Sequence, residues 1–285
     1  MRYLTIALTL FTGMILMLLI HFTSPTQTTV KYFPFDENVV FEKSETELTL
    51  LDNKNEHYIV RWISDSKTNN TIYLRQDLSL LYVDGLLKGL QSKWRENESD
   101  ISLESDIHGE GSSYYQSITY HHGEVHYKNN SIKSLNRMSY DEMYVIDSEH
   151  SSLFTFRKPK EEQQIEWKDT LDHTISQQLH YHWHNLINHF QLNYDDFLFV
   201  PLTELYQFET RNLPNLDKNQ TRKVIAQLWE GLYANYILPF QETETIQKSY
   251  IPLILFSKTG DRLYVLFQDQ HGEMRQLIQT YSINN

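Results

Sequence analysis

The chain opens with a long apolar stretch, LTIALTLFTGMILMLLIHF, at residues 4–22, from Leu4 to Phe22. It contains no acidic or basic side chain apart from the ionisable ring of His21. As an α-helix it would be about 28 Å long, close to the roughly 30 Å hydrocarbon core of a bilayer. A helix that is apolar on every side suits lipid better than a protein core. We therefore predict that residues 4–22 span a membrane.

The residues after this stretch indicate that it stays in the mature protein. A cleaved signal peptide usually has an apolar region of about 7–15 residues and a small-x-small cleavage site. Here the apolar stretch is longer, and Thr26 and Thr28, with Pro25 close by, make a poor cleavage site. Lipoprotein processing is excluded because the chain has no cysteine. We predict a retained signal-anchor in a single-pass protein of the cell membrane.

The charge beside the anchor predicts its orientation. Arg2 and the terminal amine lie on the short side, which the positive-inside rule places in the cytoplasm. We therefore expect a cytoplasmic stub at residues 1–3, the transmembrane signal-anchor at residues 4–22 and a threonine-rich spacer at residues 23–31. The C-terminal remainder would lie outside the cell. No other stretch of the sequence is long and apolar enough to span a bilayer.

Composition limits the partners and the chemistry of this remainder. The net charge of −12 argues against nucleic acid, anionic lipid and polyanionic polymers as principal partners. The absence of cysteine from the sequence excludes disulfides, thiolate zinc sites and cysteine nucleophiles. With 40% hydrophobic residues, the chain can bury a core. A cysteine-free extracytoplasmic chain that favours Lys, Asn, Ile and Tyr indicates a bacterial cell-envelope protein.

Residues 32–158 alternate mostly with a period of two, which predicts a β-rich region. The pair Asp84-Gly85 between two apolar runs predicts a β-hairpin, and His122-Gly123 predicts a second one. Residues 92–113 are polar and contain glycine, so we expect a long loop there. The predicted strands are 47–52, 57–64, 78–83, 86–90, 117–121, 124–128, 143–147 and 153–156.

The periodicity of residues 159–285 predicts a helical pair followed by a C-terminal β-meander. Apolar residues at steps of three and four predict helices, one of them interrupted near Pro201 and another capped by Asn219. The order of strands, helices and strands lacks βαβ alternation, which predicts an α+β fold with mostly antiparallel strands. Residues 32–285 are compatible with one domain. The expected helices are 161–190, 195–208 and 221–237, and the expected strands are 250–257, 262–269 and 273–281.

Several histidines gather in the predicted helix 161–190. His180 and His184 have the i, i+4 spacing of metal-binding helices, although the glutamate of the H-E-x-x-H motif is missing. At about 100° per residue, His173, His180 and His184 fall on the solvent face. His182 and His189 fall beside the apolar stripe. We interpret the cluster as surface and core-edge histidines, with a metal site as the alternative.

The predicted hairpin at His122-Gly123 provides a sharper candidate for a metal site. If these two residues form the turn, alternation places His121, Glu124 and His126 on one face of the hairpin. Two imidazoles and a carboxylate could hold Zn²⁺ and leave an open coordination position. We name these three residues as candidate metal ligands. The alternative is an exposed hairpin face with a cross-strand His–Glu pair, and no other cofactor is indicated.

Three short motifs resemble those of the penicillin-recognising serine enzymes and occur in the same order. They are Ser64-Asp65-Ser66-Lys67 for S-x-x-K, Tyr233-Ala234-Asn235 for Y-x-N and Lys258-Thr259-Gly260 for K-T-G. In that family the serine opens a buried helix and K-T-G lies on a strand that lines the site. Here the first motif ends a predicted strand and the third falls on a predicted turn. The resemblance covers ten residues, and no catalytic role is carried over from it.

The sequence therefore favours a protein that acts by binding. We expect a membrane-tethered accessory, assembly or sensory module of a bacterial cell envelope, with a protein partner in the membrane or the envelope. Any signal would pass through that partner because the predicted cytoplasmic stub is so short. The alternative is an anchored extracytoplasmic hydrolase or metal-dependent enzyme, although no G-x-S-x-G, P-loop or G-x-G-x-x-G motif occurs.

Overall fold

The computed structural model describes residues 33–51, 58–148, 151–242 and 249–281. The chain divides into two compact units, Met1–Lys31 and Tyr32–Asn285, and every described residue belongs to the second. Strands predominate and almost all pair antiparallel, so the predicted α+β class is confirmed. The predicted anchor at residues 4–22 lies outside the described residues. Among the helices that are described, none is both long and apolar enough to cross a membrane.

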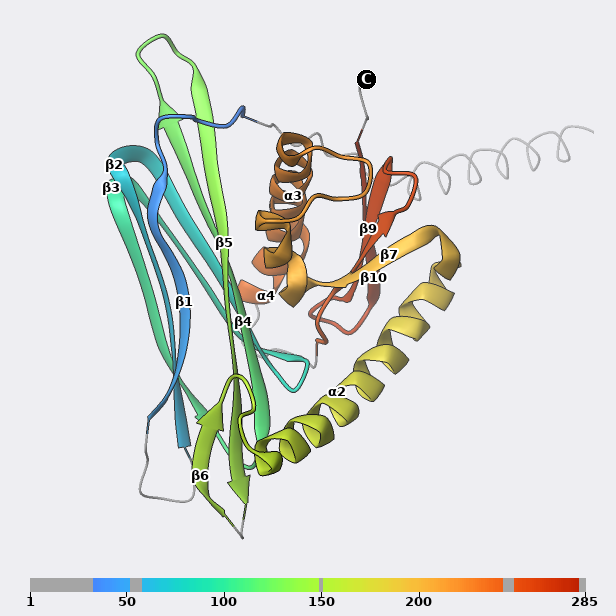
Figure 1. Ribbon diagram of the computed structural model, residues 1–285. Helices are drawn as coiled ribbons and strands as arrows, with labels where there is room; N and C mark the ends of the chain where they lie inside the picture. The colour runs from blue at the N-terminus through green and yellow to red at the C-terminus, as the bar shows by residue number, and fades with distance from the viewer. Residues whose placement is uncertain (1–32, 52–57, 149–150, 243–248, 282–285) are drawn as a thin grey trace, which may run out of the picture. The chain divides into compact units, whose positions relative to one another are not determined.

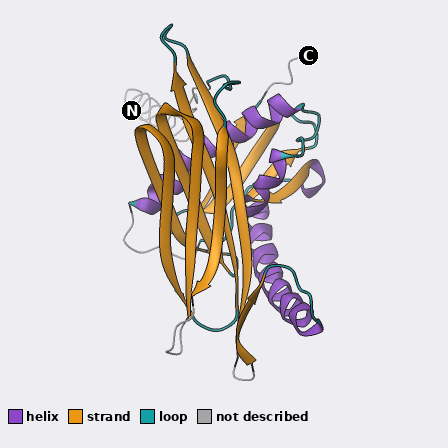
Figure 2. Cartoon of the chain, turned by 60° about the vertical axis from the view of Figure 1, so that its left-hand side comes forward, coloured by secondary structure: helices purple, strands orange, loops and turns teal. Residues whose placement is uncertain are grey.

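The first sheet is folded over on itself (Figure 1). β2 and β3 form one long hairpin whose register shifts between Lys67 and Ile72. β3 occupies one edge of β2 throughout, while β1 pairs with the first half of its other edge and β4 with the second half. Figure 2 shows these long strands turning over at one end. The strands are β1 (Phe41–Leu51), β2 (Tyr58–Val83), β3 (Leu86–Gly109), β4 (Ser113–His126), β5 (Ile132–Ser148) and β6 (Ser151–Phe156).

The fold-over creates two facing layers with a buried core between them. Trp62 from the first half of β2 packs in one cluster with Leu81 from its second half and Tyr115 from β4. The open side of the folded sheet is closed by side chains, because Asp141 on β5 accepts a hydrogen bond from the backbone N–H of Leu48 at 2.8 Å. Burial of these large side chains is the main favourable contribution to this part of the fold.

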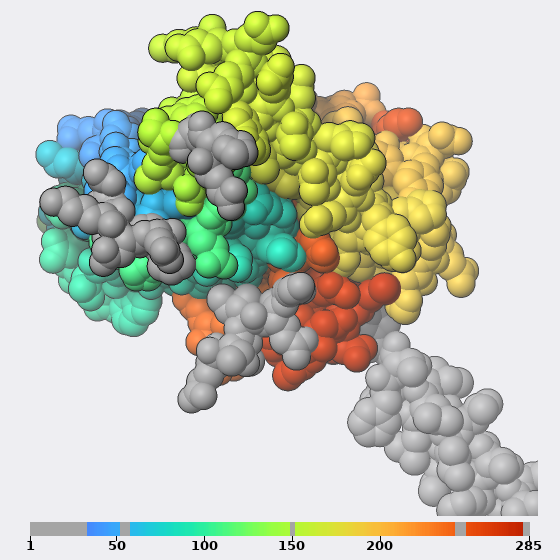
Figure 3. Space-filling model, turned by 90° about the horizontal axis from the view of Figure 1, so that it is seen from below, coloured from blue at the N-terminus to red at the C-terminus, as the bar shows by residue number. Residues whose placement is uncertain are grey.

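The remaining elements pack against the outer face of the second layer. The second sheet has the antiparallel order β10-β9-β8-β7. Figure 3 shows α2, in yellow-green and yellow, as a ridge along the surface beside both sheets. The elements are α2 (Glu162–His189), η1 (Tyr194–Asp196), β7 (Phe197–Pro201), η2 (Leu202–Glu209), α3 (Lys218–Leu232), η3 (Tyr233–Ile237), α4 (Leu238–Gln241), β8 (Leu253–Ser257), β9 (Arg262–Gln268) and β10 (Met274–Thr280).

The largest core lies between the outer face of β2, β4 and β5 and the helices that cover it. Trp229 on α3 is fully buried and stacks on Tyr120 of β4, with ring centroids 5.0 Å apart. β8 is covered on both faces: Phe256 belongs to this core, whereas Leu255 packs with Leu186 of α2 in a separate cluster. Alternation along one strand thus joins the two packing layers.

Several predicted elements differ in the structure. The expected loop at residues 92–113 is wrong, because β3 continues to Gly109 in pairing with β2. The predicted helix over residues 195–208 is two 3₁₀ turns around strand β7. α3 begins earlier than predicted, since Asp217 is its N-cap and forms a capping box with Gln220. The hairpin at Asp84-Gly85, the long helix α2 and the C-terminal meander are confirmed.

The second predicted hairpin is also wrong. β4 runs straight through His122-Gly123, with β2 on one side and β5 on the other. Gly123 serves close packing instead of a turn: an added Cβ would lie 2.5 Å from Ile72 Cδ1 and 2.9 Å from Leu135 Cδ2. The chain reverses further on, at residues 127–131, where the Tyr127 carbonyl accepts from the Asn130 backbone.

Candidate functional site

The straight course of β4 separates the three candidate metal ligands. His121 points into the folded sheet and is fully buried, while Glu124 and His126 lie on the other face of the strand. His121 Nδ1 lies 2.9 Å from Asp77 Oδ2, and its Nε2 lies 2.8 Å from Ser139 Oγ. The residue that joins Glu124 and His126 on the outer face is His122, which sequence reasoning placed in the turn.

On this outer face Glu124 stands between two histidines. His126 Nε2 lies 3.3 Å from one carboxylate oxygen and His122 Nε2 lies 3.9 Å from the other. The neighbouring rings of His122 and then His126 lower the pKa of Glu124. Within the described ranges, no three histidine or carboxylate side chains are arranged to hold a metal ion. The arrangement is a cluster of one carboxylate between two imidazoles on a half-buried strand face.

Inside the folded sheet, Arg75 and Asp77 form a buried charged pair at the bend of the β2–β3 hairpin. Both side chains are fully buried. Arg75 Nη1 donates to the Ser99 carbonyl of β3 at 2.7 Å, and its Nη2 donates to Ser66 Oγ. Ser66 Oγ in turn donates to Asp77. The guanidinium therefore ties the two strands together where their register shifts.

Ser139, His121 and Asp77 have the distances of a Ser-His-Asp triad. Acyl transfer also needs access for a carbonyl and donors for the oxyanion. Here Ser139 Oγ lies 2.6 Å from Thr46 Oγ1, which itself donates to Thr119. β1 thus covers the serine, and its hydroxyl belongs to a chain of hydrogen bonds across the two layers. We interpret this network as the polar part of the core.

The three motifs that resemble those of the serine enzymes do not line one site. Ser64 is fully buried inside the folded sheet, whereas Lys67 is exposed. Asn235 lies in η3 and donates to the Gly231 carbonyl. Lys258 lies after β8 and donates to the Asp195 carbonyl of η1. These residues belong to separate layers of the fold.

A cavity of about 600 Å³ lies between η2 and the outer face of β4 and β5. Alternation along the strands presents their even-numbered side chains there, and η2 supplies the opposite wall. Tyr140 of β5 stacks on Tyr206 of η2, with ring centroids 4.4 Å apart and planes at 7°. The lining of the cavity includes Tyr114, Gln116, Tyr140, Glu142, Glu204 and Tyr206. Arg211 also lines the cavity, and its guanidinium donates to Gln207 Oε1 at 3.1 Å.

Hydrogen bonds hold Glu142 in the cavity wall. Its Oε2 accepts from the Tyr140 hydroxyl at 2.8 Å and from the Tyr114 hydroxyl. Burial, followed by neighbouring charge, raises the pKa of both tyrosines, so they remain protonated donors. Gln116 Nε2 donates to Tyr140 at 3.1 Å and fixes that ring in turn.

Glu204 faces the same cavity from η2. Its side chain lies at the exposed rim, yet partial desolvation and then the charge of Glu142 raise its pKa. Neither carboxylate forms an ion pair with a basic side chain in the part of the chain that the structure describes. Two carboxylates therefore repel each other across a cavity walled by tyrosine rings.

Sequence reasoning missed this site. Glu142 and Glu204 were not among the residues singled out, because no spacing in the sequence relates a strand of the first sheet to a 3₁₀ helix sixty residues later. The histidines of α2 were anticipated better: His180 and His184 are exposed and His182 is buried. His189, expected beside the core, is exposed.

No protein-family model matches the chain. No curated protein matches it, and no solved structure does.

Proposed function

We propose that this is a membrane-tethered, extracytoplasmic binding protein of a bacterial cell envelope, and that the cavity between η2 and β4–β5 is its ligand site. The apolar stretch at residues 4–22 supports the tether. The main support for the binding role is the pair Glu142 and Glu204, which face one tyrosine-walled cavity and form no salt bridge with a basic side chain among the described residues. The guanidinium of Arg211 in the same lining donates to Gln207 instead.

The chemistry of the cavity favours a cationic group. Partial desolvation, and then the charge of Glu142, raises the pKa of Glu204. A positive charge between the two carboxylates would offset both effects. Tyrosine ring faces attract ammonium and guanidinium groups within about 6 Å of the ring centroid, and Tyr206 presents a partly exposed ring at the rim. The ligand class is therefore an ammonium or guanidinium group. A small amine or a Lys or Arg side chain of a protein partner supplies the same chemistry.

Binding to the full chain in detergent tests this proposal. Titration calorimetry would use choline, spermidine and short Lys- and Arg-containing peptides as probes. Glu204→Gln and Glu142→Gln should each weaken binding by about tenfold or more, since one charge contact in a partly desolvated site is worth roughly 1–2 kcal/mol. Glu166→Gln, on the exposed face of α2, is the matched control and should bind like the wild type.

The pH dependence provides a second readout. Because the pKa of Glu204 is raised, this carboxylate loses its charge at a higher pH than an ordinary glutamate. Cation binding should therefore weaken as the pH falls through that raised pKa, and Glu204→Gln should remove this part of the profile. Failure of every probe to bind, or a Glu204→Gln variant that binds like the wild type, would refute the cationic site.

The same pair of carboxylates also supports the alternative of an anchored hydrolase. Two carboxyl groups in different environments can divide the roles of general acid and general base: Glu204, with its raised pKa, would be the acid, and the tyrosine-bound Glu142 the base. The test is release of reducing sugars from isolated cell-wall glycan. Activity that is lost in Glu204→Gln and kept in Glu166→Gln would favour this reading over binding alone.

A further inference from the structure

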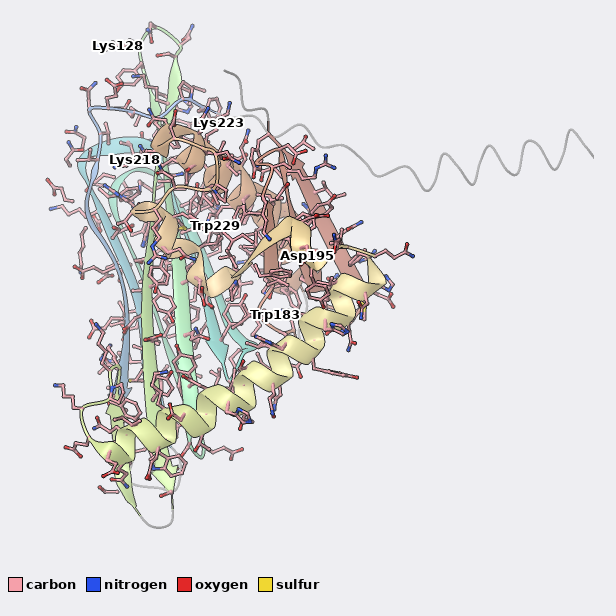
Figure 4. All side chains as sticks on the ribbon, turned by 45° about the vertical axis from the view of Figure 1, so that its right-hand side comes forward. Lys128, Trp183, Asp195, Lys218, Lys223 and Trp229 are labelled. Carbon is pink, nitrogen blue, oxygen red and sulfur yellow. The ribbon has the colours of Figure 1, made fainter. Side chains whose placement is uncertain are left out.

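The cavity between η2 and β4–β5 has two ends of different charge. At one end Glu204 lies near enough to Glu142 that, after desolvation, the charge of Glu142 raises its pKa. At the other end Glu209 Oε1 accepts a hydrogen bond from the backbone N–H of Met138 at 2.8 Å. Figure 4 shows η2 beside the strands of the first sheet and next to α3, on which Trp229 is labelled. We call the first of these the acidic end.

The geometry of β5 gives the distance between the two ends. Met138 and Glu142 lie on the same face of this strand, four residues apart, so their Cα atoms are separated by about 13 Å at roughly 3.3 Å per residue. The stacked rings of Tyr140 and Tyr206 lie between the two ends. The lining of the cavity therefore extends along η2 and is long enough for a ligand with two separate charged groups.

The end opposite the acidic end carries a cation. Among the described residues that line the cavity, Arg211 is the only basic one. Its guanidinium donates to Gln207 Oε1 at 3.1 Å, and the described ranges contain no carboxylate in a salt bridge with it. Glu209 at the same end pairs with Arg137 at 3.0 Å instead. A guanidinium has five N–H donors, so Arg211 keeps donors for a ligand.

The hydroxyl of Tyr206 senses both signs of charge. Burial raises the pKa of Tyr206, and the charges of Glu142 and Glu204 raise it further, whereas the charge of Arg211 lowers it. The three charged groups therefore act on one hydroxyl group within the same cavity. Opposite charges at the two ends are thus within reach of one small molecule.

We propose that the cavity binds a short peptide by its two free ends, with the N-terminal ammonium between Glu142 and Glu204 and the C-terminal carboxylate on Arg211. This inference rests on the cationic site of the proposed function and names its ligand more closely. A guanidinium pairs with a carboxylate through two parallel hydrogen bonds. Two or three extended residues span about 7–10 Å, which matches the separation of the ends once a hydrogen bond of about 3 Å is added at each. A single amino acid is too short to reach both.

Titration calorimetry of the full chain in detergent would test the two contacts separately. The probes are trialanine, its C-terminal amide, which lacks the carboxylate, and its N-acetyl derivative, which lacks the ammonium. The methyl side chains carry no charge, so the probes differ only at their ends. Trialanine should bind about tenfold or more tightly than either derivative, because each derivative loses one charge-assisted contact. Alanine should bind no better than alaninamide, because neither reaches both ends of the cavity.

Matched variants assign the carboxylate contact to its residue. Arg211→Gln should remove the preference for trialanine over its amide, so that the two bind with about equal affinity. Choline has no carboxylate and should bind this variant at least as tightly as it binds the wild type, because a neighbouring positive charge is gone. Arg95→Gln, at an exposed arginine of β3, is the control and should keep the preference for trialanine.

Three outcomes would overturn the inference. They are equal binding of trialanine and its amide by the wild type, a preference for trialanine that persists in Arg211→Gln, and weaker choline binding by that variant, which would mean that Arg211 supports the acidic end. The choline titration also keeps the two proposals apart. If choline and spermidine bind but trialanine has no advantage over its amide, only the peptide inference is refuted. If no cationic probe binds, the proposed function fails as well.

Discussion

His182 should make the protein lose stability in mild acid. It lies on α2 with only 8% of its surface exposed, and its ring centroid is 4.5 Å from that of Tyr250. Its Nε2 has no hydrogen-bond partner within the described residues. Burial lowers its pKa from 6.5 to about 4, because an imidazolium in this position would give up its hydration without gaining a partner.

The sign and the size of the effect follow from this shift. The unfolded chain takes up the proton near pH 6.5, whereas the folded chain resists protonation until about pH 4. Acid therefore favours the unfolded state, so the contribution of His182 is fully present above pH 6.5 and is lost as the pH falls toward 4. A shift of this size corresponds to about 3 kcal/mol of unfolding free energy.

Urea denaturation of the full chain in detergent, followed by tryptophan fluorescence from pH 7.5 to 4, would measure it. His182→Phe keeps an aromatic ring against Tyr250 and removes the titrating group. Its unfolding free energy should fall by about 3 kcal/mol less than that of the wild type. His180→Gln, an exposed histidine of the same helix, should follow the wild type. Parallel curves for His182→Phe and the wild type would refute the reasoning.

Substitutions in the folded sheet and in α3 should act in opposite directions. Arg75→Met leaves Asp77 buried beside no guanidinium and should lower the unfolding free energy by about 3 kcal/mol or more; a loss below about 1 kcal/mol by urea titration would contradict the role of Arg75 at the bend. Gly123→Ala forces a contact with Ile72 and should cost about 1–3 kcal/mol, partly recovered by Ile72→Val. A Cβ added at Gly231 of α3 would have no atom within 4 Å apart from the backbone of its own helix. Gly231→Ala should therefore raise the unfolding free energy by up to about 1 kcal/mol in the same assay.

The elements that sequence reasoning recovered are those whose signals are local. Asp84 and Gly85 both adopt positive φ, 51° and 78°, as a two-residue hairpin turn requires. The helical period of α2 likewise lies within one segment. It predicted His182 beside the apolar stripe, and this residue is buried, whereas His189, predicted there too, is exposed. Such signals need no knowledge of which distant segment lies opposite.

The errors arose where distant residues decide the structure. Gly123 resembles a turn residue until Ile72 and Leu135 are seen to press on it from neighbouring strands. Because residues 122 and 123 belong to the strand and not to a turn, His121 points into the folded sheet, on the face opposite to Glu124. Polar residues 92–113 resemble a loop because nothing near them in the sequence shows that β2 supplies their hydrogen-bond partners.

The sequence by itself determined the apolar stretch at residues 4–22, the acidic cysteine-free composition and the α+β class, since each depends on composition or on the period of one segment. Only the tertiary structure decided the fold-over of the first sheet and the cavity with its two ends. Glu142 meets Glu204, and Met138 meets Glu209, through packing of elements far apart in the chain. No local pattern encodes those meetings, because each depends on which surfaces the whole unit buries together.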